Sequence, residues 1–190
     1  MLTVTIPRHS ADGPAPTTVI IMGVSGAGKS VVAHALAEST GWQFAEGDDF
    51  HPAANVEKMQ SGIPLDDEAR WPWLRSIAAW IGDQEQAGHS SVVTCSALKR
   101  GYRDLLCEGH SSVRFCQLDA STGVLQARME ARSEHYMPRS LLHSQLRTLE
   151  SLEPDEPGGR VSAEGDIHMV LRRVLHLLAS PDGSAARAAS

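Results

Sequence analysis

Cysteine is scarce in this sequence. The 190 residues include three cysteines, Cys95, Cys107 and Cys116, and no two of them form a C-x-x-C pair. An odd number without paired spacing argues against a disulfide framework and against a zinc site. Cys95 and Cys116 lie in apolar runs typical of strands, so we expect them to be small buried side chains. Reduced thiols of this kind favour a cytoplasmic location.

Long apolar runs and an excess of positive charge are also missing. No stretch approaches the ~20 apolar residues of a membrane-spanning helix, and the first residues show no apolar core of a secretory signal peptide. The formal net charge is −6, which argues against binding to nucleic acid or to a membrane surface. We therefore expect neither as a partner, although local basic groups could still bind a phosphorylated ligand.

The most informative stretch that is present consists of Gly23, Val24, Ser25, Gly26, Ala27, Gly28, Lys29 and Ser30. It matches G-x-x-x-x-G-K-[ST], the phosphate-binding P-loop. A β-branched run of strand length precedes it and a helical apolar pattern follows it, as the motif requires. Backbone N–H groups of such a loop form an anion-binding nest at a helix N-terminus. Lys29 can reach the β- and γ-phosphates of ATP, and Ser30 can place its hydroxyl on Mg²⁺.

Strands alternate with helices along the rest of the chain. Strands are predicted at 17–22, 42–47, 91–95, 113–118 and 160–163, and helices from near Gly28 and at 55–61, 70–87, 99–107, 121–133, 138–150 and 166–179. This order predicts an α/β fold in which helices cover both faces of a parallel sheet. We expect one domain at 17–179, with flexible segments at 1–16 and 180–190.

Ligands of such sheets bind at the carboxyl ends of the strands. This rule places the P-loop, Asp48 and residues 96–100 along one rim. A carboxylate at position 48 could orient a hydroxyl nucleophile, accept its proton, or hold Mg²⁺ through water. The alternative for Asp48, and equally for Asp49, is an acid in a solvated turn.

Basic residues supply further candidates. Arg70, Lys99, Arg100 and Arg103 could each bind an anionic substrate, or could form surface ion pairs that contribute little. Arg128 and Arg132 are spaced i, i+4 and so share one helix face. Two arginines on one face would suit a lid that closes over a nucleotide and stabilises charge on a phosphoryl group in transfer. A solvated helix face is the alternative.

Several blocks together resemble the P-loop type of gluconate kinase, a family of the shikimate kinase-like group. The blocks are G-D-x-x-H-P at 47–52, P-W-L at 72–74 and C-S-A-L-K-R at 95–100, followed by the stretch from Arg132 to Met137-Pro138. The P-loop alone is unspecific, whereas the combination is specific. The similarity runs in order from about Val19 to about Glu153.

The resemblance implies ATP-dependent phosphorylation of D-gluconate at its terminal C6 hydroxyl, with Mg²⁺. It also implies a five-stranded parallel core, a mobile lid at about 128–140 and a homodimer. Positions 23–30 would bind ATP, Asp48 would act near the substrate hydroxyl and share Mg²⁺ with Ser30, and Lys29, Arg128 and Arg132 would act on the phosphates. The implied substrate residues are Asp48, His51, Lys58, Arg70, Lys99, Arg103, His135 and Gln145.

Three other functions are compatible with a P-loop. Another small-molecule kinase, such as a shikimate-type enzyme, would share every feature except the substrate pocket. A GTPase switch is disfavoured because the sequence contains no N-K-x-D guanine-reading motif. A non-catalytic ATP-binding regulator is disfavoured because Lys29, Ser30 and Asp48 are all present.

Overall fold

A five-stranded parallel sheet forms the centre of the protein. The computed structural model describes residues 15–131 and 139–180. The sheet order is β2 (Gln43–Ala45), β3 (Ser91–Thr94), β1 (Thr18–Met22), β4 (Val113–Asp119) and β5 (Gly158–Ser162). All neighbouring pairs are parallel. The predicted α/β fold with a five-stranded parallel core is confirmed.

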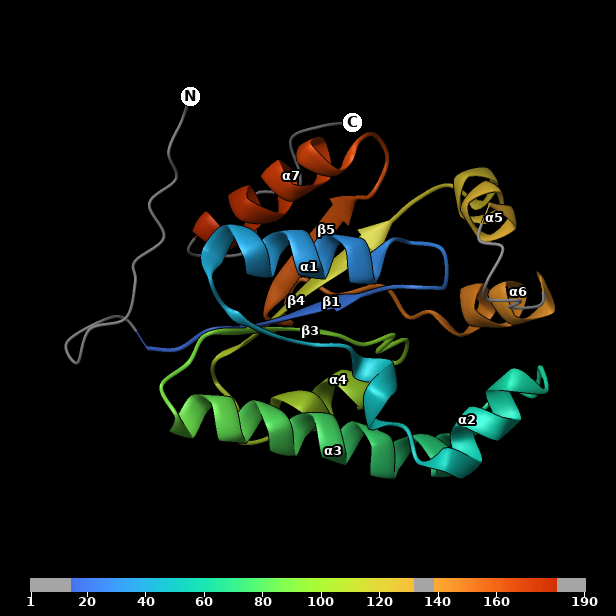
Figure 1. Ribbon diagram of the computed structural model, residues 1–190, viewed down its shortest axis with the longest axis horizontal. Helices are drawn as coiled ribbons and strands as arrows, with labels where there is room; N and C mark the ends of the chain where they lie inside the picture. The colour runs from blue at the N-terminus through green and yellow to red at the C-terminus, as the bar shows by residue number, and fades with distance from the viewer. Residues whose placement is uncertain (1–14, 132–138, 181–190) are drawn as a thin grey trace.

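Helices cover both faces of this sheet. Figure 1 shows α1 (Lys29–Thr40) and α7 (Ile167–Ala179) on one face, and α3 (Asp67–Gln86) and α4 (Arg100–Cys107) on the other. Alternate residues of β1 enter two separate cores. Val19 and Ile21 pack with the α1 and α7 side, and Ile20 and Met22 pack with the α3 and α4 side. This two-sided burial explains why β1 is apolar without alternation.

Three further helices lie at the carboxyl ends of the strands. They are α2 (Ala53–Gln60), α5 (Thr122–Glu130) and α6 (Arg139–Thr148), which Figure 1 shows together beyond one end of the sheet. The P-loop opens toward the same end, because β1 runs directly into it. Of the predicted lid at 128–140, residues 132–138 lie outside the described residues, as do most of the predicted terminal segments. Within the described ranges, no helix is long and apolar enough to cross a membrane.

Two predicted boundaries differ from the structure in ways that matter for the site. The second strand ends at Ala45, and Gly47–Phe50 instead forms a short 3-10 helix. Helix α3 begins at Asp67 and not at Arg70, because the Asp66 carboxylate accepts a hydrogen bond of 2.8 Å from the Ala69 N–H and caps the helix. Pro72 therefore lies inside the helix and not in its first turn.

Candidate active site

The P-loop is a tightly packed turn between β1 and α1. Gly23, Gly26 and Gly28 have φ angles of 137°, 82° and 93°, a region that side chains rarely occupy. A Cβ on Gly23 or Gly26 would lie 2.9 Å from the backbone oxygen of Leu118 or Leu125. The loop therefore needs glycine for both conformation and space. Its amides and the first turn of α1 provide the donors that a phosphate chain requires.

Asp48 is held over the end of β3 by its neighbour Gly47. The Gly47 N–H donates to Thr94 Oγ1 at 2.9 Å, and the Gly47 carbonyl accepts a bond of 2.7 Å from Trp73 Nε1. A Cβ at position 47 would lie 1.8 Å from the Thr94 backbone oxygen. The 3-10 helix is thus fixed against both β3 and α3, and Asp48 faces the same cavity as Lys29.

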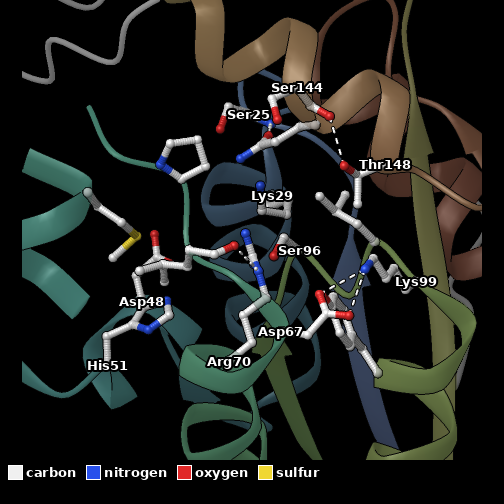
Figure 2. Close-up of a pocket in the computed structure, with 16 residues that line it drawn as sticks. Ser25, Lys29, Asp48, His51, Asp67, Arg70, Ser96, Lys99, Ser144 and Thr148 are labelled. Atoms are coloured by element: carbon white, nitrogen blue, oxygen red, sulfur yellow. Dashed lines mark hydrogen bonds and ion pairs between the residues drawn. The ribbon is translucent and has the colours of Figure 1, made fainter.

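This cavity, of about 240 Å³, brings together predicted residues of the P-loop with five of the eight predicted substrate residues. Figure 2 shows side chains from the P-loop, the 3-10 helix, α3, the turn after β3 and α6 around it. Predicted residues that line it are Ser25, Lys29, Asp48, His51, Arg70, Lys99 and Gln145. Residues without a predicted role also line it, among them Met59, Leu65, Asp67, Tyr102, Ser144 and Thr148, together with Ser96 of the predicted rim.

His51 is a neutral hydrogen-bonding group. Its ring stacks on Trp73, with centroids 4.2 Å apart and an angle of 13° between the planes. Burial, helped by the charge of Arg70, lowers the pKa of His51 from 6.5 to about 4. Asn55 Nδ2 donates to the Ala69 oxygen at 2.8 Å and lies 3.5 Å from His51 Nδ1. This arrangement makes Nδ1 an acceptor, which leaves the ring proton on Nε2.

Asp67 binds two of its neighbours in the cavity. Lys99 Nζ lies 2.8 Å from each carboxylate oxygen of Asp67, and the Tyr102 hydroxyl donates to Oδ1 at 2.5 Å. The bonds from Lys99 and Tyr102 lower the pKa of Asp67, whereas burial and the bond to Asp67 raise the pKa of Tyr102. Asp67 is therefore ionised at neutral pH and Tyr102 keeps its proton.

Positive charge exceeds negative charge around the cavity. Among the described residues, the lining includes three cations, Lys29, Arg70 and Lys99, against two carboxylates, Asp48 and Asp67. The neutral His51 leaves this balance unchanged. A cavity with a net positive lining favours an anionic ligand.

Helix α6 reaches the P-loop through one side chain. Gln145 Oε1 accepts a hydrogen bond of 2.7 Å from the backbone N–H of Ser25. Ser144 and Thr148 of the same helix also line the cavity, and the Thr148 hydroxyl bonds to the Ser144 carbonyl at 2.9 Å. An amide oxygen thus bonds to one of the N–H groups of the predicted phosphate cradle.

Three described residues that were predicted to act on the substrate or the phosphates do not line the cavity, and two further predicted residues lie outside the described part of the chain. Arg103 is 1% exposed and forms a buried ion pair with Glu156, so its assignment to the substrate is corrected: it is a structural residue. Lys58 is exposed on α2, whereas its neighbour Met59 faces the cavity. Arg128 donates to the Ala27 oxygen at 3.3 Å and to the Ala163 oxygen at 2.7 Å, and so braces the P-loop from outside the cavity. Arg132 and His135 lie outside the described residues.

Sequence signals existed for some of the residues that were missed. Asp66 followed by Asp67 and Glu68 is typical of a capped helix start, and this pattern would have placed Asp67 on α3 near Arg70. Ser144 and Thr148 are spaced i, i+4 and so share a helix face beside Gln145.

The sheet, the P-loop and the acid after the second strand define a P-loop kinase. A family model described as an AAA domain matches residues 19–152. The gluconokinase of Gluconobacter oxydans is 48% identical over 90% of this chain and 96% of its own length. The probable gluconokinase of Xenopus tropicalis is 37% identical over 82% of this chain and 90% of its own. The chain therefore belongs to the gluconokinase family.

Solved structures agree with this placement. An unliganded sugar kinase from Janibacter is 51% identical, with a TM-score of 0.82 over 86% of this chain and 94% of its own. A gluconokinase from Sinorhizobium meliloti is 43% identical, with a TM-score of 0.78 over 87% of this chain and 93% of its own. Shikimate kinase from Aquifex aeolicus, at 15% identity and a TM-score of 0.54, shares the fold alone.

Proposed function

We propose that this protein transfers the γ-phosphoryl group of ATP to the C6 hydroxyl of D-gluconate, giving 6-phospho-D-gluconate and ADP. The observation that carries the proposal is the single cavity in which Lys29 of the P-loop, Asp48 and a surplus of positive charge face one another. A sugar acid has a hydroxyl that can react between Lys29 and Asp48, and a carboxylate that the surplus positive charge can bind. Membership of the gluconokinase family supports this choice of substrate.

ATP would lie along residues 23–30. The loop amides and the N-terminus of α1 would bind its phosphates, and Lys29 would neutralise charge that develops during transfer. Ser30, in the first turn of α1, and Asp48 supply the oxygen ligands that Mg²⁺ prefers, so these residues fit the ion. Bound there, Mg²⁺ would offset the charge of the β- and γ-phosphates.

Asp48 would serve the acceptor hydroxyl. An alcohol with a pKa far above 7 is a poor nucleophile, and a carboxylate within reach orients it and accepts its proton late in the reaction. The bond from O6 to the γ-phosphorus forms while the bond to the bridging oxygen of ADP breaks. ADP leaves with that electron pair, and the O6 proton passes to Asp48. His51, with a proton on Nε2, would donate a hydrogen bond to a substrate oxygen.

The remaining predicted roles stay within this proposal. Arg128 would act by bracing the P-loop through its bonds to Ala27 and Ala163. Arg132 and His135 would belong to the lid that meets the phosphates, and Gln145 would lie beside the γ-phosphate, as its bond to Ser25 suggests. A homodimer and a cytoplasmic location are proposed with them. Light scattering and cell fractionation test these two.

A substrate panel tests the proposed function. Purified protein with ATP and Mg²⁺ would be offered D-gluconate, shikimate, glycerate, glucose and nucleoside monophosphates. We expect kcat/KM on D-gluconate to exceed the others by at least about a hundredfold, the scale of a matched polar site. Preferred turnover of shikimate or another acceptor would keep the P-loop mechanism and reject the substrate. ATP binding without turnover of any acceptor would favour a regulator.

The Asp48→Asn variant tests the mechanism separately. Loss of the proton acceptor should lower kcat by about 10²- to 10⁴-fold. Asp49→Asn is the matched control, because Asp49 lies in the same 3-10 helix and is exposed like Asp48, but does not line the cavity. It should keep turnover close to wild type. Near-normal kcat in Asp48→Asn would remove this carboxylate from the mechanism.

A further inference from the structure

We propose that Arg70 binds the carboxylate of the sugar acid. We further propose that Asp67, together with the Lys99 and Tyr102 side chains bonded to it, binds hydroxyl groups along the carbon chain of the substrate. The inference rests on the proposed function and deepens it. Asp67 becomes a specificity-determining residue, and the two basic lining residues outside the P-loop, Arg70 and Lys99, receive different roles. The physical basis is that Lys99 already forms an ion pair with Asp67 in the cavity, whereas Arg70 does not.

The charge of Lys99 is already matched by Asp67. The ammonium group lies 2.8 Å from both oxygens of the Asp67 carboxylate, and the pair faces the cavity. A substrate carboxylate that approached Lys99 would lie beside the negative charge of Asp67. It would have to displace that carboxylate or accept its repulsion. Lys99 is therefore a poor anchor for an anion as long as Asp67 is ionised.

Arg70 forms no such ion pair in the described part of the chain, although its charge helps to lower the pKa of Asp67. Its Nε donates to the Leu65 carbonyl at 3.2 Å, and its guanidinium carbon lies 5.8 Å from the centre of the Tyr102 ring. Among the described residues, no carboxylate forms an ion pair with it. Figure 2 shows the side chain rising from α3 into the cavity beside Ser96. The bond at Nε fixes the guanidinium plane and leaves the two Nη groups to form the paired bonds that bind a carboxylate.

The cluster of Asp67, Lys99 and Tyr102 suits hydroxyl groups. An ionised carboxylate has about four acceptor positions, and three are used by Lys99 and Tyr102. An ammonium group has three donors, and Asp67 takes two of those of Lys99. One acceptor position on Asp67 and one N–H donor on Lys99 therefore remain. A sugar hydroxyl can donate a hydrogen bond to the first and accept one from the second. Such a site rejects a compound without that hydroxyl, because its polar groups would be left unpaired.

The test compares D-gluconate with D-glucitol, in which a neutral CH₂OH group replaces the carboxylate. For each protein, kcat/KM would be measured for both compounds. Where glucitol turnover is below detection, its inhibition constant against gluconate would be compared with the gluconate KM. The variants are Arg70→Gln, Lys99→Gln and Asp67→Asn, with circular dichroism to confirm folding. Arg70→Lys keeps the charge but loses the paired geometry.

We expect Arg70→Gln to lower kcat/KM for gluconate by about a hundredfold, mainly through KM, and to leave glucitol nearly unchanged. Arg70→Lys should fall between Arg70→Gln and wild type. Lys99→Gln should weaken both compounds, so that the preference for gluconate over glucitol stays within about threefold of wild type. Asp67→Asn should also weaken both compounds, but it frees the charge of Lys99 and should leave the preference for gluconate equal to or higher than that of wild type. The inference is overturned if Lys99→Gln abolishes that preference, or if Arg70→Gln retains it. Absence of gluconate turnover in the wild-type protein would instead reject the proposed function itself.

Discussion

Arg103 and Glu156 form a two-pronged ion pair in the interior of the protein. Nε lies 2.5 Å from Oε2 and Nη2 lies 2.8 Å from Oε1, and the two side chains are 1% and 4% exposed. Arg103 Nη1 also donates to the carbonyls of Ala97, at 3.1 Å, and Glu150, at 2.9 Å. The arginine thus joins α4, the turn after β3 and the segment that follows α6. Ala97, with a φ of 41°, lies between two cavity residues, Ser96 and Lys99.

Removal of this arginine should be costly to stability. Arg103→Met would leave Glu156 charged and buried without its partner, so we expect the free energy of unfolding to fall by about 3–5 kcal/mol in denaturant titrations. Arg160→Met is the control, since the pair of Arg160 with Asp119 is 53% and 32% exposed and should contribute less than about 1 kcal/mol. A stable Arg103→Met protein with a raised KM for gluconate would return Arg103 to the substrate site.

Gly47 should be irreplaceable because of space and not because of its backbone angle. In Gly47→Ala the new Cβ would meet the Thr94 oxygen at 1.8 Å, so the backbone before Asp48 must move. We expect about 1–3 kcal/mol of lost stability and about a hundredfold loss of kcat, since catalytic carboxylates tolerate little displacement.

Gly123→Ala provides the comparison for this position. Gly123 lies in α5, and a Cβ added there would point into open space. Alanine in a helix is favoured by up to about 1 kcal/mol over glycine, so Gly123→Ala should be neutral or stabilising. Thermal unfolding and steady-state kinetics of the two variants distinguish the cases. Normal kcat in Gly47→Ala would show that the 3-10 helix is not what positions Asp48.

The local features of this protein could be predicted from sequence, and the long-range partners could not. The strands and the P-loop depend on patterns within a few residues, and they were located to within two or three positions. The sheet order was not predicted, because the pairing of β1 with both β3 and β4 depends on contacts far apart in the chain.

The site residues also divide into those that local sequence could predict and those that depend on distant partners. An arginine after a strand has the same local sequence whether it points into a cavity or into the core. For Arg103 the answer depends on Glu156, 53 residues further on. Asp67 was missed for a similar reason: its partners Lys99 and Tyr102 lie 32 and 35 residues away, and only the fold brings them together. Asp48 lines the cavity, as the strand-end rule predicts from local information alone.

His51 should make stability depend on pH. Its pKa in the folded protein is about 4, against an ordinary value of 6.5, so between these values the unfolded chain binds more protons than the folded one. Stability should therefore fall as the pH is lowered from about 6.5 to about 4. Urea unfolding at several pH values would show a shallower fall in this window for His51→Asn. His89→Asn, at an exposed position, should follow wild type. Identical slopes in all three proteins would contradict the buried neutral state of His51.

A change at Gln145 should affect the binding of ATP more than that of ADP, because Gln145 contacts the P-loop. Its amide oxygen bonds to the Ser25 N–H at 2.7 Å, so a carboxylate in its place would lie against the γ-phosphate and repel it. We expect Gln145→Glu to raise the KM for ATP by about tenfold or more, and to weaken ADP much less, because ADP lacks that phosphate. His143→Glu introduces the same residue at an exposed position of the same helix and should leave both affinities unchanged. Equal losses for ATP and ADP in Gln145→Glu would place this side chain away from the γ-phosphate.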